Sequence, residues 1–287
     1  MKDYKIKIGT RGSKLALAQA MDVSKRLNEI GFETEIIEIK SHGDEDHTPL
    51  RLSKEFGLFT KRINEELLNE KIDIAVHSMK DIPTEIENGL KIVAVLKRDN
   101  YEDFFVSNYN VLNLESGKKV GTSSPRRRSF LKILRPDLEI VDLRGNVETR
   151  LKKFESNEVD ALILALAGLK RLNLKVPGYV LDPDIFVPQA NQGIIAIVSR
   201  NDSSFNGKIS KINDEKTFDL ANVEREFLKE MDAGCHSSVG ILARFIGNKI
   251  LVHVSIVKDI RMDYWSIFKL NELNNEINKF RRWYNGR

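Results

Sequence analysis

Residues 7–13 read KIGTRGS, and residues 119–125 read KVGTSSP. In both stretches a short apolar segment ends at Gly-Thr, and a helical pattern follows within a few residues. A strand that leads directly into a helix is the building unit of α/β proteins with parallel sheets. The two stretches therefore predict two strand-to-helix junctions of the same design.

The similarity continues on the carboxyl side of each junction. Residues 35–39 (EIIEI) have a counterpart in residues 139–143 (EIVDL), and residues 73–76 (DIAV) have one in residues 160–164 (DALIL). Three matching segments in the same order indicate two similar units, and chance similarity of such junctions is the alternative. We expect an α/β protein with mainly parallel sheets, built as two similar periplasmic-binding-protein-like lobes around a cleft.

A change in composition marks a third region. Residues 201–216 are rich in Asn, Asp, Ser and Lys, which is typical of a domain boundary. Residues 218–231 then predict a helix, and residues 239–257 alternate around Gly247-Asn248, a hairpin signal. We expect the remaining tail to be helical. The expected domains are residues 1–98 with 191–214, residues 99–190, and a small α+β domain at 215–287.

The composition excludes several classes of protein. The chain has 287 residues, of which 41% are hydrophobic and 31% charged, as in an ordinary soluble globular protein. No apolar run approaches the roughly 18 residues of a membrane span, and Met1 leads straight into a strand-like stretch without a signal peptide. With a single cysteine, the chain is expected to be cytoplasmic. The net charge of +4 is mild, and no nucleic-acid-reading motif is present, so no nucleic-acid partner is expected.

The second junction carries a cluster of basic residues. Residues 122–124 offer three hydroxyl groups before an expected helix, and residues 126–128 are three consecutive arginines. A helix N-terminus attracts anions, and arginine binds carboxylates through paired hydrogen bonds. A solvated basic surface is the alternative, but Arg11 and Ser13 occupy the matching place in the first unit. The pattern predicts an anion site. No phosphate-binding glycine loop is present, so a nucleotide is not expected.

Two further features could carry chemistry. Cys235 is the only cysteine, and the small residues of DAGCHSSVG (232–240) leave space around its sulfur. An inert cysteine and a reactive one both remain open from this local pattern. Lys80-Asp81 follows a predicted strand, where a carboxylate could stabilise developing positive charge, although such a pair is more often plain surface. His77 is interpreted as a structural histidine. The histidines lack metal-ligand spacing, so no metal is predicted.

Taken together, these segments resemble the hydroxymethylbilane synthases, also called porphobilinogen deaminases. The matching residues span roughly positions 5–240, and the most specific segment is DIAVHSMKDIP at residues 73–83. The others are residues 9–11, 121–124, 126–127, 143–147 with Arg150, 167–171, 192–193 and 234–235. The resemblance implies a transferase of tetrapyrrole (porphyrin and haem) biosynthesis. Such an enzyme joins four porphobilinogens stepwise to a covalent dipyrromethane primer, releases ammonia each time, and hydrolyses off the linear tetrapyrrole hydroxymethylbilane.

The resemblance also implies roles for individual residues. Cys235 would carry the dipyrromethane cofactor through a thioether, and Asp81 would be the catalytic carboxylate. Other contacts to the cofactor would come from Lys80, Asp81, Thr122, Ser123, Ser124, Arg126, Arg127, Arg144, Leu164 and Ala165. The substrate porphobilinogen would be held by Arg11, Ser13, Phe59, Arg144, Arg150, Arg171 and Gln192.

The chain departs from the family's usual pattern at three places. Phe56 stands where bacterial members usually have lysine, Pro125 stands where leucine is common, and HSSV at residues 236–239 replaces the common Gln-Val-Pro-Ile. We expect a monomer with no membrane partner. The alternative function is a non-enzymatic two-lobed anion-binding module, which would have no use for Cys235.

Overall fold

The computed structural model describes residues 4–39, 58–231 and 238–286, without the side chains of Leu58 and Phe59. The chain divides into two compact units. Unit 1 consists of Met1–Asp99 and Ile194–Asp219, and unit 2 consists of Asn100–Gly193 and Leu220–Arg287. The expected division into three domains, with a separate domain at 215–287, stays a prediction.

Unit 1 is built on a five-stranded sheet with the order β2-β1-β3-β10-β4. Its neighbours β1, β2 and β3 run parallel, whereas β10 pairs antiparallel with both β3 and β4. The sheet is therefore mainly parallel, as expected, with β10 as the strand that runs the other way. Strand–helix–strand units force parallel pairing, but β10 comes from a distant part of the chain and is free of that constraint. The strands are β1 (Ile6–Thr10), β2 (Thr34–Glu38), β3 (Ile74–Ser78), β4 (Leu90–Val95) and β10 (Ile195–Arg200).

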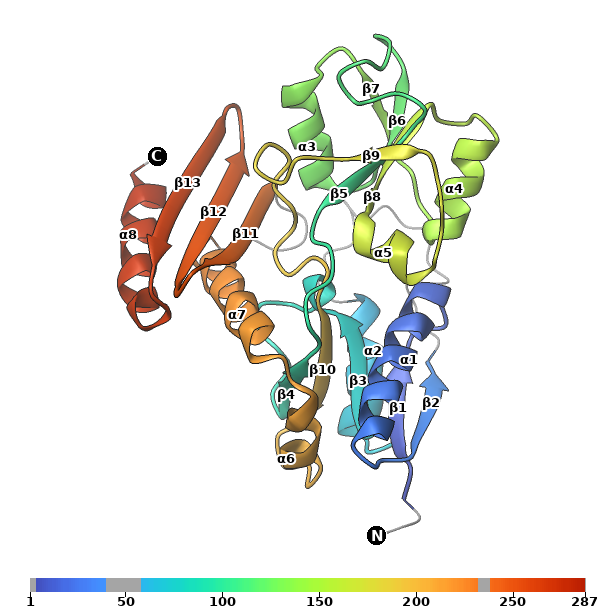
Figure 1. Cartoon of the computed structure of the whole chain (residues 1–287), viewed down its shortest axis with the longest axis vertical. Coiled ribbons are helices and arrows are strands. Elements are labelled where there is room, and N and C mark those ends of the chain that lie inside the picture. The colour runs from blue at the N-terminus through green and yellow to red at the C-terminus, as the bar shows by residue number, and fades with distance from the viewer. Residues whose placement is uncertain (1–3, 40–57, 232–237, 287) are drawn as a thin grey trace. The chain divides into compact units, whose positions relative to one another are not determined.

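The helices of unit 1 connect its parallel strands. Helix α1 (Lys14–Glu29) joins β1 to β2, and α2 (Leu58–Leu68) precedes β3. Because β1 lies between β2 and β3, right-handed crossovers place the two helices on opposite faces of the sheet, as Figure 1 shows. The described residues of the unit also form the short helices η2 (Met79–Asp81), α6 (Asn206–Ile209) and η3 (Ser210–Ile212).

Unit 2 repeats this design in a second five-stranded sheet, with the order β7-β6-β8-β5-β9. Again the first three strands in this order are parallel, and the fourth, β5, pairs antiparallel with both of its neighbours. The predicted duplication is therefore confirmed. The strands are β5 (Asp103–Val106), β6 (Lys119–Gly121), β7 (Glu139–Val141), β8 (Ala161–Ala165) and β9 (Gly178–Val180), and the helices are α3 (Pro125–Leu134), α4 (Val147–Glu155) and α5 (Leu166–Arg171).

The alternation of side chains along β8 explains how this sheet is covered. Ile163 belongs to a core with Phe130 of α3, whereas its neighbour Leu162 belongs to a second core with Leu151 of α4. Successive side chains of a strand point to opposite faces, so α3 and α4 cover opposite faces of the sheet (Figure 1). Both faces are apolar, as expected for a sheet enclosed between helices.

The last part of unit 2 is a three-stranded antiparallel sheet, β11-β12-β13. The predicted hairpin is confirmed, and its turn contains Gly247 at φ +60°. The prediction of an all-helical tail is wrong, because β13 pairs with β12 along its length. The exposed positions of β13 are Asp263, Trp265 and Ile267, so exposure alternates along the strand with a period of two. The polar composition of the strand hides this alternation in the sequence. The elements are α7 (Glu215–Glu230), β11 (Val239–Ile246), β12 (Lys249–Val257), β13 (Arg261–Phe268), η4 (Leu270–Glu272) and α8 (Leu273–Asn285).

Helices α7 and α8 pack on one face of this small sheet. The rings of Phe227 in α7 and Phe280 in α8 pack edge to face there, with their centroids 5.0 Å apart. The other face contributes Leu242 and Val257 to the core beneath α3. The small sheet is therefore joined to the β5–β9 sheet through shared apolar packing. Among the described helices, none has both the length and the apolar character needed to cross a lipid bilayer.

Candidate functional site

In unit 2 the predicted anion-binding residues lie at one edge of the sheet. Strands β6 and β8 are parallel neighbours, so their carboxyl ends meet at this edge. Residues 122–124 follow β6, and Leu164 and Ala165 end β8. Ser124 caps α3, with its Oγ accepting a hydrogen bond from Arg127 N at 3.4 Å. Pro125 occupies the first turn of the helix, as predicted.

The junction itself is fixed by short-range contacts. Thr122 Oγ1 accepts a hydrogen bond from Ser124 N at 3.2 Å, and Ser123 Oγ donates one to Leu143 O at 2.9 Å. Gly121 is needed because a Cβ at this position would lie 2.6 Å from Leu143 Cδ2. The close approach of β6 to Leu143 thus brings the loop that carries Arg144 beside the start of α3.

Arg126 and Arg127 point into the unit and share one carboxylate. Asp103, which begins β5, is fully buried, and the two arginines are only 3% and 7% exposed. Arg126 Nη2 donates to Asp103 Oδ2 at 2.5 Å, and Arg127 Nη2 donates to Asp103 Oδ1 at 2.7 Å. Arg126 and Arg127, which the sequence analysis assigns to an anion site, therefore form a buried cluster with an internal anion.

The two arginines also donate side-chain hydrogen bonds to backbone carbonyls. Arg126 Nη1 donates to Val187 O at 2.7 Å, and Arg127 Nη1 donates to Ile163 O at 2.8 Å. Burial alone would raise the pKa of Asp103, but the two guanidinium groups lower it to about 2. The carboxylate is therefore ionised at neutral pH, and the cluster retains one net positive charge.

Arg144 and Arg150 extend this positive region along the same edge. Arg150 Nε donates to Gly145 O at 2.8 Å, just after Arg144. Burial, with the nearby charges of Arg127 and Arg144, lowers the pKa of Arg150 to about 10. A bound carboxylate would reverse that shift, because an opposite charge stabilises the protonated form. The third arginine of the predicted run, Arg128, pairs instead with Asp142 at 2.7 Å.

The remaining predicted substrate residues of unit 2 are tied to the segment before β10. Arg171 Nη2 donates to Gly193 O at 2.7 Å. Gln192 Nε2 donates to Tyr101 O at 2.8 Å and to Asp103 Oδ1 at 3.0 Å. Gln192 and Arg127 thus donate to the same oxygen, Asp103 Oδ1. This oxygen links Gln192, which is predicted to bind substrate, to Arg127, which is predicted to bind the cofactor.

In unit 1 the other predicted residues also share one sheet edge. Arg11 follows β1, Lys80 and Asp81 form η2 directly after β3, and β1 and β3 are parallel neighbours. Ser13 caps α1, with its Oγ accepting a hydrogen bond from Ala16 N at 3.3 Å. The side chain of Asp81 is exposed, whereas the preceding Met79 is fully buried. The buried methionine anchors a turn that presents the carboxylate at the surface of the unit.

His77 lies beneath this edge, in β3. Only 6% of it is exposed, and its Nε2 has no hydrogen-bond partner among the described residues. Burial lowers its pKa to about 4, and the charge of Arg11 contributes in the same direction. The imidazole is therefore neutral at neutral pH, and the contribution of Arg11 indicates that the guanidinium lies close to it.

Two predicted positions lie outside the described residues: Cys235 with its neighbours, and the side chain of Phe59. The chain is described again from Ser238, whose Oγ lies 2.8 Å from Ser129 Oγ of α3. The segment that follows Cys235 is therefore joined to the helix that also carries Arg126 and Arg127. The clearest residue that the sequence analysis missed is Asp103, whose only signal is an acidic residue at the start of the apolar stretch DFFV.

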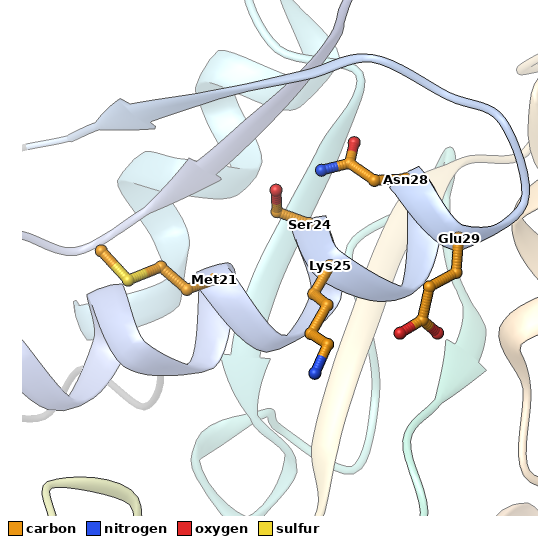
Figure 2. Close-up of a pocket in the computed structure, with 5 residues that line it drawn as sticks. All are labelled: Met21, Ser24, Lys25, Asn28 and Glu29. Atoms are coloured by element: carbon orange, nitrogen blue, oxygen red, sulfur yellow. The ribbon is translucent and has the colours of Figure 1, made fainter.

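A shallow pocket of about 470 Å³ lies elsewhere on unit 1, along the outer side of α1 (Figure 2). One helix supplies all of its lining side chains, which are Met21, Ser24, Lys25, Asn28 and Glu29. It contains none of the predicted residues and does not resemble an enclosed ligand site. Within the described ranges, no three or more His, Cys, Asp or Glu side chains group as a metal site would require. The expectation of no metal stays a prediction.

Comparison with known proteins gives a consistent result. The family model described as "Porphobilinogen deaminase, dipyromethane cofactor binding domain" matches residues 6–206. A protein of Picrophilus torridus named "Probable porphobilinogen deaminase" is 43% identical over 96% of this chain and 99% of its own length. Proteins with the same name from Sulfurisphaera tokodaii and Thermoplasma volcanium are each 46% identical, over 83% and 84% of this chain and 81% of their own lengths.

Two solved structures show weaker similarity. The methionine-binding protein MetQ is 15% identical, with a TM-score of 0.47 over 77% of this chain and 94% of its own. A periplasmic substrate-binding protein from Coxiella burnetii is also 15% identical, with a TM-score of 0.43 over 77% of this chain and 96% of its own. Similarity this weak carries no argument about ligand or activity.

Proposed function

The chain belongs to the porphobilinogen deaminase family, enzymes of tetrapyrrole biosynthesis with a dipyrromethane cofactor, and we propose that it is a hydroxymethylbilane synthase that acts stepwise. It joins four porphobilinogens in turn, releases one ammonia for each, and then frees the linear tetrapyrrole by hydrolysis. The observation that carries this proposal is that Arg144 and Arg150 extend the positive sheet edge formed by Arg127, where burial, and after it the charges of Arg127 and Arg144, lower the pKa of Arg150. A ligand with several carboxylates relieves that repulsion.

The cofactor fits the donor set of unit 2. Each pyrrole ring carries an acetate and a propionate, and arginine is suited to bind such planar anions in pairs of hydrogen bonds. When bound to Cys235 through a thioether, the dipyrromethane supplies the terminal pyrrole ring to which a new ring is joined. We assign its remaining contacts to Lys80, Asp81, Thr122, Ser123, Ser124, Arg126, Arg127, Arg144, Leu164 and Ala165.

Asp81 is the proposed catalytic residue. Porphobilinogen becomes positively charged when its ammonia leaves, and a fixed carboxylate stabilises that charge. The same carboxylate accepts a hydrogen bond from the pyrrole N–H and keeps the ring in place. The exposure of Asp81 at the end of β3, over the buried Met79, supports this role because the carboxylate is accessible and its backbone is anchored.

The substrate's own carboxylates require cations and hydrogen-bond donors. We assign this role to Arg11, Ser13, Phe59, Arg144, Arg150, Arg171 and Gln192, with Phe59 stacking on the pyrrole ring. Gln192 is fixed at this edge, because both of its amide N–H groups donate to protein acceptors, Tyr101 O at 2.8 Å and Asp103 Oδ1 at 3.0 Å. In this proposal the protein is a cytoplasmic monomer whose partner is porphobilinogen, with neither a nucleic acid nor a membrane involved.

The stoichiometry of ammonia release tests the proposed reaction. Purified protein is incubated with porphobilinogen, and the ammonia released, the substrate consumed and the tetrapyrrole formed are measured. We expect one ammonia per porphobilinogen and one free tetrapyrrole per four porphobilinogens. An anion-binding module would bind porphobilinogen without releasing ammonia, and that result would contradict the proposal.

A further inference from the structure

We propose that Asp103 is a positioning residue, which orients Arg126 and Arg127 for binding the carboxylates of the pyrrole chain and fixes Gln192 beside them. This inference rests on the proposed function. Asp103 begins β5, and its register partner is Ala165 at the carboxyl end of β8. Its carboxylate therefore lies at the same sheet edge as the start of α3, although it comes from a strand that runs in the opposite direction.

Both oxygens of Asp103 are used by side chains of this edge. Oδ2 accepts a hydrogen bond from Arg126 Nη2, and Oδ1 accepts bonds from Arg127 Nε at 3.1 Å and Nη2 at 2.7 Å. Gln192 Nε2 donates to the same Oδ1 at 3.0 Å. Two hydrogen bonds from one guanidinium fix its plane as well as its position.

The three partners of Asp103 come from elements far apart in the sequence. Arg126 and Arg127 lie in the first turn of α3, whereas Gln192 lies just before β10. The fully buried carboxylate of Asp103 contacts all three. Its removal leaves two adjacent buried guanidinium groups without their shared anion, so their mutual repulsion changes their orientation.

Two roles for Asp103 make opposite predictions. If the carboxylate only reduced the positive potential, its neutralisation would strengthen the binding of a polycarboxylate ligand. If it positions the donors, both neutralisation and displacement of the carboxylate weaken binding. Asp103→Asn removes the charge at nearly constant shape. Asp103→Glu keeps the charge but moves it by about 1.5 Å, the length of one carbon–carbon bond.

The experiment measures equilibrium binding, not turnover. Each substitution is made in a full-length Cys235→Ser chain, which cannot form the thioether. Its dissociation constant for a synthetic dipyrromethane with acetate and propionate groups is measured by isothermal titration calorimetry. We expect both Asp103 variants to bind at least about tenfold more weakly, the order of one charge-assisted hydrogen bond.

The control is Glu276→Gln in the same background. Glu276 is also a buried carboxylate of unit 2, but its partners are Tyr264 and Lys279 in the C-terminal sheet and α8. This variant reports the general effect of losing a buried charge, and we expect its dissociation constant to match that of the parent.

The outcomes are distinguishable. If the parent Cys235→Ser chain binds the dipyrromethane and both Asp103 variants bind it equally or more tightly, the positioning role is overturned. If Asp103→Asn is not obtained as folded protein, the dissociation constant of the charge-preserving Asp103→Glu is compared with that of the parent. Weaker binding then supports the positioning role, and equal or tighter binding overturns it. If the parent itself binds no dipyrromethane, the proposed function fails, and the positioning role fails with it.

Discussion

Acid sensitivity provides a quantitative test of the environment of His77. Burial and the charge of Arg11 lower its pKa on folding from 6.5 to about 4. Between these values the unfolded chain binds a proton that the folded protein does not bind, so stability falls as the pH falls through this window. At 1.36 kcal/mol per pKa unit, the loss reaches about 3 kcal/mol near the lower limit.

The assay is urea unfolding, followed by circular dichroism, at several pH values from neutral to about 4. The wild-type protein is compared with His77→Gln, whose side chain stays neutral throughout. As the pH is lowered, we expect the free energy of unfolding of the wild type to fall by about 3 kcal/mol more than that of the variant. His253→Gln is a useful comparison, because Asp263 opposes the effect of burial there and the expected difference is smaller. Parallel acid profiles for wild type and His77→Gln would refute the reasoning.

Three further substitutions test the proposed reaction. Asp81→Asn should leave the fold and the bound cofactor intact while lowering kcat by roughly 10²–10³, and near-normal kcat would remove its assigned role. Arg144→Leu should impair cofactor assembly or raise the KM for porphobilinogen, because carboxylates lose a bidentate partner; unchanged loading and kinetics would argue against that placement. Gly145→Ala should cost about 1–3 kcal/mol of stability, because Gly145 has φ +110° and a Cβ there would lie 2.7 Å from Thr149 Cγ2. It should also raise KM by displacing Arg150, and equal thermal stability would contradict this.

Much of the fold follows from features that act locally. The Gly-Thr junctions mark strand ends, and the duplicated order of segments predicts two equivalent sheets, which the matching strand orders confirm. The strands that the analysis missed depend on distant pairing. Strand β10 takes its place between β3 and β4 only in the folded chain, and β13 has a polar, weakly alternating sequence that its pairing with β12 stabilises.

The sequence proposes which residues form the candidate site, but it does not give their internal contacts. The run of arginines after residues 122–124 indicated an anion site, yet sequence spacing could not show which guanidinium groups face the core. Asp103 is 23 positions from Arg126 and 89 from Gln192 along the chain. Only the antiparallel pairing of β5 with β8 brings its carboxylate to the edge where α3 begins.

The central claim is that Cys235 carries a dipyrromethane whose carboxylates are held by the arginines of unit 2. The most direct test is the intact mass of protein purified from a host that makes porphobilinogen. We predict an excess equal to two linked pyrrole units in the wild type and its absence in Cys235→Ser. A wild-type protein that has only the mass of its sequence, even after incubation with porphobilinogen, would contradict the claim.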